Sequence, residues 1–448
     1  MDLKKIHNVY FIGIGGIGMS ALARYFKSIG KEIFGYDRTS TVLTQELESE
    51  GIHITYKDLI ETIPEEIVIE NSLVVYTPAI PENHIQKNEL IKQGFSLYKR
   101  SEVLGLITEN TTCLAVAGTH GKTSTTSLLG HILHENQVKS TAFLGGICEN
   151  YNSNLILGGN EYSVVEADEF DRSFLKLSPN VMAITSMDAD HLDIYGEHAA
   201  LEKSFQDFVN KLPEDGVLIT KKGLPIQGIT YAIEEEADFI AKNIRIERGA
   251  FVFDVWNKEN LYTDFKLYLP GRHNIENALA AIAVALETGL DFNQIKKGIQ
   301  SFQGIKRRFS IHHNKEVVYI DDYAHHPTEL NAAFNAVREM FPYKKLLTVF
   351  QPHLFSRTQD FVEDFAKSLE QVDELILMDI YPARELPIEG VTSEWLLSKI
   401  EIEKKEIGTL KNTLKKIKEK EFDVLLTVGA GNIDTLVEPI KKWLKNER

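Results

Sequence analysis

Glycine, lysine and threonine residues follow one apolar stretch of the sequence at a spacing that suits phosphate binding. Residues 112–117 have the composition of a buried strand, and Gly118 and Gly121 end it. Lys122 and Thr123 come next, and apolar residues then recur at helical spacing. A glycine loop at a helix start points backbone N–H groups at an anion. Lys122 adds a positive charge for the β- and γ-phosphates of a nucleotide, and the Thr123 hydroxyl can bind Mg²⁺.

The strict phosphate-loop pattern G-x-x-x-x-G-K-[ST] is not met, because Val116 stands at the position of its first glycine. The remaining motif is G-T-H-G-K-T. We still expect the loop to bind ATP, because two glycines, a lysine and a threonine all follow a strand. The ATP-binding residues predicted here are Gly118, Thr119, His120, Gly121, Lys122, Thr123 and Ser124.

Two further polar residues follow neighbouring predicted strands. Glu166 ends the apolar stretch that begins at residue 162, and His191 lies soon after the stretch 181–185. The carboxyl ends of parallel strands meet at one edge of a sheet, so Glu166 and His191 should converge on Thr123. A hydroxyl, a carboxylate and an imidazole beside a triphosphate predict a magnesium site at Thr123, Glu166 and His191.

A second glycine motif lies near the N-terminus. Residues 13–18 match G-x-G-x-x-G after a predicted strand, and Asp37 ends the next strand. This is the dinucleotide fingerprint, and taken alone it indicates NAD. A helix N-terminus without side chains accepts any pyrophosphate, however, and an acid accepts ribose hydroxyls. Any nucleotide diphosphate therefore satisfies the motif.

Strands and helices alternate along most of the chain, which predicts an α/β protein. We expect three domains: a Rossmann-like N-terminal domain at residues 1–107, a central P-loop ATPase-like domain with a mixed or parallel sheet at 108–305, and a Rossmann-like C-terminal domain at 306–448. In the last of these, polar residues again follow the predicted strands, which we expect to be parallel.

The composition is that of a globular protein and excludes several classes of partner. The chain has 448 residues and a formal net charge of -16, which argues against nucleic acid or an anionic membrane as the main partner. No apolar stretch reaches the ~18 residues of a membrane span. Cys113 and Cys148 offer neither a disulfide framework nor metal spacing, so we expect buried thiols in a cytoplasmic protein.

These motifs together resemble those of the Mur ligases, ATP-dependent amino-acid ligases of peptidoglycan precursor synthesis. The resemblance covers nearly the whole chain. It lies in residues 118–123, 166–169, 190–193, 273–274 with Asn277, and 322–325. Residues 11–20 and 350–353 are most similar to those of family members that join L-alanine to the lactyl carboxylate of UDP-N-acetylmuramate. The resemblance implies these two substrates, ATP and Mg²⁺, and an acyl phosphate intermediate.

The resemblance also implies a role for each motif. The UDP-sugar would be bound by Gly15, Gly16, Ile17, Gly18 and Asp37. Asn274 and Asn277 would line the ATP cleft. The implied catalytic residues are Lys122, Glu166, His191, Arg308 and Asp322, of which the last two reach the ATP from the third domain. L-alanine would be bound by Tyr323, His353 and Arg357.

The chain departs from the family pattern at a few positions. Ser186 and Asp188 stand where Asn and Glu are usual, and Leu354 stands where an Arg is expected after His353. The carboxylate of the amino acid would then depend on Arg357 or another base. Some members carry a carbamylated lysine, but Lys203 does not fall at that spacing.

Three other functions stay open at this point. A related muropeptide ligase would add a peptide or another amino acid. An NAD-dependent dehydrogenase would use the N-terminal glycines but leaves the second glycine loop unexplained. A nucleotide-gated binding protein leaves His353 and Arg357 unexplained.

Overall fold

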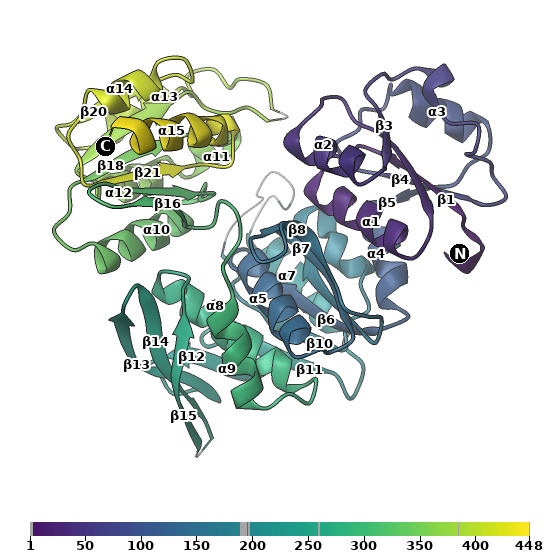
Figure 1. Ribbon diagram of the computed structural model, residues 1–448, viewed down its shortest axis with the longest axis horizontal. Helices are drawn as coiled ribbons and strands as arrows, with labels where there is room; N and C mark the ends of the chain where they lie inside the picture. The colour runs from purple at the N-terminus through teal and green to yellow at the C-terminus, as the bar shows by residue number, and fades with distance from the viewer. Residues whose placement is uncertain (1–2, 189–194, 196–197, 259, 384, 448) are drawn as a thin grey trace. The chain divides into compact units, whose positions relative to one another are not determined.

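The computed structural model describes residues 3–188, 195, 198–258, 260–383 and 385–447. The chain forms three β-sheets with helices packed around them (Figure 1). It divides into two compact units. The first consists of Met1–Ile240, Val255–Tyr262 and Asn277–Phe302, and the second of Ala241–Asp254, Thr263–Glu276 and Gln303–Arg448. The α/β architecture with three sheets confirms the predicted fold class.

The N-terminal sheet has five parallel strands in the order β3-β2-β1-β4-β5. The strands are β1 (Asn8–Ile12), β2 (Glu32–Tyr36), β3 (His53–Thr55), β4 (Ser72–Tyr76) and β5 (Leu97–Lys99). The helices are α1 (Ile17–Ser28), α2 (Val42–Ser49), α3 (Ile85–Lys92) and α4 (Arg100–Thr108). This strand order is that of a Rossmann sheet without its sixth strand, and it places the ends of β1 and β2 side by side.

The central sheet has ten strands in the order β15-β14-β13-β12-β11-β10-β6-β9-β7-β8. Its strands are β6 (Thr112–Ala117), β7 (Ser140–Cys148), β8 (Ser153–Leu157), β9 (Tyr162–Ala167), β10 (Val181–Ile184), β11 (Val217–Lys221), β12 (Ile229–Ile233), β13 (Phe239–Glu247), β14 (Ala250–Asn257) and β15 (Asn260–Leu267). Its helical segments are α5 (Lys122–Glu135), η3 (Phe170–Lys176), α7 (His198–Val209), α8 (Arg272–Leu286) and α9 (Phe292–Ser301). The strand β6 has the predicted bounds and pairs in parallel with β9 and β10, so the residues that follow these three strands share one edge.

The C-terminal sheet has six strands in the order β16-β17-β21-β18-β19-β20. They are β16 (Ser310–Asn314), β17 (Val318–Asp322), β18 (Leu346–Phe350), β19 (Glu374–Met378), β20 (Lys405–Gly408) and β21 (Val424–Val428). The helices are α10 (Pro327–Met340), α11 (Phe355–Asp360), α12 (Val362–Leu369), α13 (Ser393–Lys399), α14 (Thr413–Lys418) and α15 (Val437–Glu447). The predicted strands β17, β18, β19 and β21 are parallel as expected, and one further strand, β16, is antiparallel to β17. A connection as short as the one between them can join only antiparallel strands.

One apolar core connects the N-terminal and central sheets. Buried residues of β1 and α1, among them Phe11 and Phe26, belong to the same cluster as Phe143 of β7 and Leu155 of β8. The rings of Tyr25 and Phe143 lie 5.2 Å apart, and α1 packs on both β7 and β8 (Figure 1). Among the described residues, no helix is both long and apolar enough to cross a membrane.

Candidate active site

The loop between β6 and α5 has a backbone that requires glycine at two positions. Gly118 has φ of 135° and Gly121 has φ of 83°, both in the region that side chains disfavour. A Cβ atom at Gly118 would overlap the Thr185 hydroxyl, and one at Gly121 would overlap the side-chain oxygen of Asn277. Gly121 is the N-cap of α5, so the first N–H groups of this helix are available to an anion. Asn277 therefore lies directly beside the phosphate loop.

The segment that follows β10 forms hydrogen bonds with the loop between β6 and α5. The backbone N–H of His120 donates to the Ser186 hydroxyl at 2.7 Å, and the Thr119 hydroxyl lies 3.0 Å from the same oxygen. The Asp188 N–H donates to the Thr119 hydroxyl at 3.0 Å, and the Asp188 carboxylate lies 3.4 Å from His120 Nε2. Two of the positions where the sequence departs from the family pattern thus contact the loop itself.

Lys122 is paired with a fully buried acid. Its Nζ lies 2.9 Å from Glu169 Oε2 and donates to the Gly118 carbonyl at 2.6 Å. Burial alone would lower the pKa of Lys122, but the charges of Glu169, Asp168 and Glu166 outweigh burial and raise this pKa. The neighbouring carboxylates therefore hold Lys122 as a cation at the start of α5.

Oxygen atoms suited to a magnesium ion lie one residue further along α5. The Thr123 hydroxyl donates to both Glu166 carboxylate oxygens at 3.0 Å. Gly145 of β7 packs so closely on Glu166 that a Cβ atom there would overlap the carboxylate. Hydroxyl and carboxylate oxygens are ligands that Mg²⁺ prefers, so this pair fits the ion. His191, the third predicted ligand, lies outside the described residues. Ser124 lies half-buried in the first turn of α5.

The N-terminal glycine loop is held by the acid that follows β2. The Gly15 N–H donates to the Asp37 carboxylate at 2.8 Å, and a Cβ atom on Gly15 would lie 2.8 Å from the same oxygen. Gly16 is the N-cap of α1, and Ile17 is the first residue of the helix. Asp37 thus shapes the loop, and the first N–H groups of α1 are available to an anion.

Arg100 is a cation beside this loop that our sequence analysis did not identify. It is the first residue of α4, and a Cβ atom on Gly18 would lie 2.8 Å from its Cδ atom. Its Nη2 lies 3.6 Å from an Asp168 oxygen of the central domain. The strand β5, which Arg100 follows at the edge of the same parallel sheet, was not predicted from the sequence. Glu169 was visible only as the last residue of E-A-D-E.

In the C-terminal domain, Asp322 fixes the segment that carries Arg308. Its buried carboxylate accepts from the Phe309 and Ala324 N–H groups, both at 2.7 Å. The Arg308 guanidinium lies 5.2 Å from the centre of the Tyr323 ring. Burial raises the pKa of Asp322, although Arg308 acts against it. In this structure Asp322 therefore acts on the backbone around Arg308.

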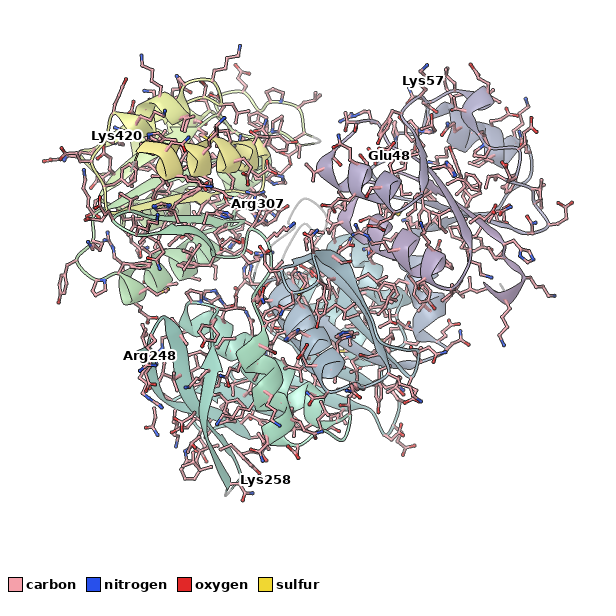
Figure 2. All side chains as sticks on the ribbon, in the orientation of Figure 1. Glu48, Lys57, Arg248, Lys258, Arg307 and Lys420 are labelled. Atoms are coloured by element: carbon pink, nitrogen blue, oxygen red, sulfur yellow. The ribbon has the colours of Figure 1, made fainter. Side chains whose placement is uncertain are left out.

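Arg307, labelled in Figure 2, completes the same segment. Its Nε donates to Asp321 at 3.1 Å and its Nη2 to the Gly429 carbonyl at 2.6 Å. Its guanidinium also lies 5.2 Å from the Tyr323 ring centre. Burial raises the pKa of Asp321 to about 6 against the opposing effect of Arg307. Two adjacent arginines thus lie over one aromatic ring.

His353 belongs to an aromatic cluster at the end of β18. Its ring stacks on Tyr381 at 5.8 Å and lies 5.8 Å from His325, which in turn is 5.4 Å from Tyr323. Tyr323 and His353 are thus brought together. Leu354 is 5% exposed and has φ of 71°. A buried apolar side chain therefore occupies the position where the family resemblance suggests an arginine.

Arg357 and Asn274 are both buried polar residues. Arg357 lies in α11 and is 6% exposed. The Asn274 amide donates to the Pro270 carbonyl at 2.7 Å, so it braces the start of α8. The helix begins at Arg272, and Asn274 is therefore inside the first turn rather than at the cap.

Comparisons with known proteins assign the chain to one family. Sequence models described as Mur ligase family, catalytic domain; Mur ligase middle domain; and Mur ligase, glutamate ligase domain match residues 8–112, 116–285 and 307–431. The chain is 55% identical to the UDP-N-acetylmuramate–L-alanine ligase of Flavobacterium psychrophilum, with 99% of each chain covered. It is 56% identical to the protein of that name from Christiangramia forsetii, over 100% of this chain and 99% of that one.

Solved structures agree with the sequence comparisons. The UDP-N-acetylmuramate–alanine ligase of Thermotoga maritima matches with a TM-score of 0.84 and 27% identity, covering 98% of this chain and 100% of that one. A murein peptide ligase from Psychrobacter arcticus has the same fold, with a TM-score of 0.71 and 22% identity over 99% of each chain. The chain belongs to the Mur ligase family of ATP-dependent ligases, which form carbon–nitrogen bonds.

Proposed function

We propose that this Mur ligase joins L-alanine to the lactyl carboxylate of UDP-N-acetylmuramate during peptidoglycan precursor synthesis in the cytoplasm. The observation that carries the proposal is the pair of glycine loops in one compact unit, each at the start of a helix with a cation beside it. Two such loops suit two phosphorylated substrates. The name shared by relatives of 55% and 56% identity indicates which substrates these are.

The reaction would proceed in two steps. The lactyl carboxylate attacks the γ-phosphorus of ATP and displaces ADP, which leaves an acyl phosphate. The amine of L-alanine then attacks the acyl carbon, phosphate departs, and the amine loses a proton. The carboxylate and the triphosphate repel each other, so the site must cancel negative charge. Lys122 and the first turn of α5 supply positive charge there. Bound magnesium, held by Thr123, Glu166 and His191, would add to it.

The three predicted domains would each take one substrate. In this proposal residues 1–107 bind the UDP-sugar, with its diphosphate at residues 15–18 and its uridine near Asp37. Residues 108–305 bind ATP, and residues 306–448 bind L-alanine and supply Arg308. The short contact between Asn277 and the phosphate loop supports the ATP assignment. The hydrogen bonds of Asp322 support a role in holding Arg308.

ADP release tests the proposal directly. We expect release from ATP only when UDP-N-acetylmuramate and L-alanine are both present. Release that requires a peptide or another amino acid in place of L-alanine would indicate a related muropeptide ligase. Slow release that is indifferent to the amino acid would indicate a nucleotide-gated binding protein. Either result contradicts the proposal.

A further inference from the structure

A buried amide of the central domain contacts the first turn of α1 in the N-terminal domain. Asn154 of β8 is 0% exposed. Its Nδ2 donates to the Ile17 carbonyl at 2.6 Å and to the Ser20 hydroxyl at 2.8 Å. Its Oδ1 accepts from Arg24 at 2.6 Å, and Arg24 is anchored by Glu50 at 2.6 Å. Both amide protons and the amide oxygen are used, so the group has one orientation.

These contacts reach the backbone of the N-terminal glycine loop. The Ser20 hydroxyl, which accepts from Asn154, lies 3.0 Å from the Gly16 carbonyl and 2.9 Å from the Ile17 carbonyl. Gly16 and Ile17 are the N-cap and first residue of α1. Movement of Asn154 would therefore change the direction of the N–H groups in this turn.

The strand that carries Asn154 belongs to the sheet that carries the ATP loop. β8 pairs with β7, β7 with β9, and β9 with β6. Glu166 lies at the carboxyl end of β9, one residue before its last, and the phosphate loop follows β6. The path from α1 to the phosphate loop therefore consists of hydrogen-bonded strands and a buried amide whose hydrogen-bonding atoms all have partners. Such a path is a stiff connection.

We infer that Asn154 is a positioning residue that keeps the UDP-sugar loop in register with the ATP loop, a role that rests on the proposed function. The ligation needs a carboxylate of one substrate aligned with the γ-phosphorus of the other, and small misplacements are costly. The Asn154 amide would maintain this alignment without contacting either substrate, since it contacts the side of the first turn of α1 through Ile17 and Ser20.

The test is Asn154→Asp, which keeps the volume and the Arg24 contact but removes both donated hydrogen bonds. Calorimetric titration with UDP-N-acetylmuramate should show Kd raised roughly tenfold, the effect of losing a buried hydrogen bond. The Kd of a non-hydrolysable ATP analogue should stay within about twofold, since the phosphate loop keeps all its contacts. Asn180→Asp is the matched control, because the Asn180 amide oxygen accepts from Cys113 N–H at the opposite end of β6. It should leave both affinities unchanged.

Ser20→Ala removes the hydroxyl that accepts a hydrogen bond from Asn154, and it is the test of the inference if Asn154→Asp does not fold. It should weaken UDP-N-acetylmuramate binding about threefold, again without an effect on the ATP analogue. If Asn154→Asp folds and binds UDP-N-acetylmuramate with wild-type affinity, or if both affinities are weakened equally, the inference about Asn154 is wrong and the proposed function is unaffected. With no folded Asn154→Asp protein, the same two results from Ser20→Ala overturn the inference. A wild-type protein that binds no UDP-N-acetylmuramate overturns the proposed function and this inference together.

Discussion

Lys122 is a cation whose charge depends on one fully buried carboxylate. Burial lowers the pKa of a lysine, and here Glu169 is the largest of the three charges that oppose this effect. The raised pKa means that, while Glu169 is ionised, the pair contributes stability that is fully present below the pKa of an unfolded lysine, about 10.4. That contribution is lost as the pH rises through the folded value.

We expect Glu169→Gln to make the reaction sensitive to alkaline pH. Without Glu169, burial of Lys122 is opposed only by Asp168 and Glu166, so the pKa of Lys122 falls. The variant should lose single-turnover rate as the pH rises through the lowered pKa of Lys122, whereas the wild type stays level over the same pH range. Glu161→Gln is the control, since Glu161 pairs with Lys139 on the surface. Parallel pH profiles for all three proteins would contradict the assignment of Lys122.

Arg357 is expected to bind the carboxylate of L-alanine through two parallel hydrogen bonds. Lysine cannot form this pair, so Arg357→Lys should lower kcat/KM for L-alanine by at least tenfold although the charge is kept. Wild type should prefer L-alanine to glycine by roughly 10–200-fold, the effect of one methyl group. Arg338→Lys is a matched control, because Arg338 lies on the surface beside Asp373. Wild-type kinetics in the Arg357 variant would mean that another base binds the carboxylate.

The sequence identified the residues that follow strands but not their partners. The motif G-T-H-G-K-T predicted a cation at Lys122, whereas its pairing with Glu169 depends on how β9 continues into η3. Arg100 was missed because its approach to Gly18 joins two helices that are distant in sequence. Leu354 could not be placed, because its positive φ and its burial depend on the C-terminal sheet around it.

At the scale of elements, the buried strands were easier to predict than the strands at the edges of the sheets. The apolar composition of 112–117 was sufficient to give the bounds of β6, since a strand buried on both faces has a continuous apolar sequence. The edge strand β16 was not predicted, because residues 310–314 are mostly polar. The ten-stranded extent of the central sheet was not predicted, because the sequence after residue 216 has only short alternating stretches.

A chain of ion pairs joins β19, β20 and α14 at one edge of the C-terminal sheet. Lys420, labelled in Figure 2, lies 2.7 Å from Glu374 and 2.6 Å from Glu406, and Lys345 and Lys416 pair with the same two acids. Burial alone would raise the pKa of the Glu374 and Glu406 carboxyls. Hydrogen bonds from the lysines outweigh the effect of burial, so both pKa values are lowered. Their stabilising effect is therefore present above the unfolded pKa, about 4.3, and is lost as pH falls through the folded values.

Lys420→Met should reduce the free energy of unfolding by about 1–3 kcal/mol at pH 7, because two acids lose a charged hydrogen-bond donor. The difference from wild type should shrink below about pH 4, where the acids become protonated in both proteins. Urea unfolding at several pH values measures this. Lys441→Met, which removes an exposed pair with Glu438, should change the free energy by less than about 1 kcal/mol. A Lys420 effect that does not vary with pH would indicate lost packing instead.

At the scale of the whole molecule, the chain divides into two compact units, so we expect more than one unfolding transition. UDP, which we propose binds at residues 15–18, should raise the transition temperature of the first unit only. At a concentration of 100 times Kd it should add about 2.7 kcal/mol to that unit. Scanning calorimetry with UDP and with NAD makes the comparison. A larger shift with NAD than with UDP would favour a dinucleotide site and contradict our assignment.

The apolar core that joins the first two sheets constrains how such ligases can be recombined. Phe26 of α1 packs in one cluster with Phe143 and Leu155, which lie far along the chain. A chimaera joined near residue 107 would therefore pair half of one core with half of another. A crossover beyond Leu157 keeps α1, β7, β8 and Asn154 from a single parent. Modules that transfer nucleotide-sugar preference between relatives should therefore extend through β8.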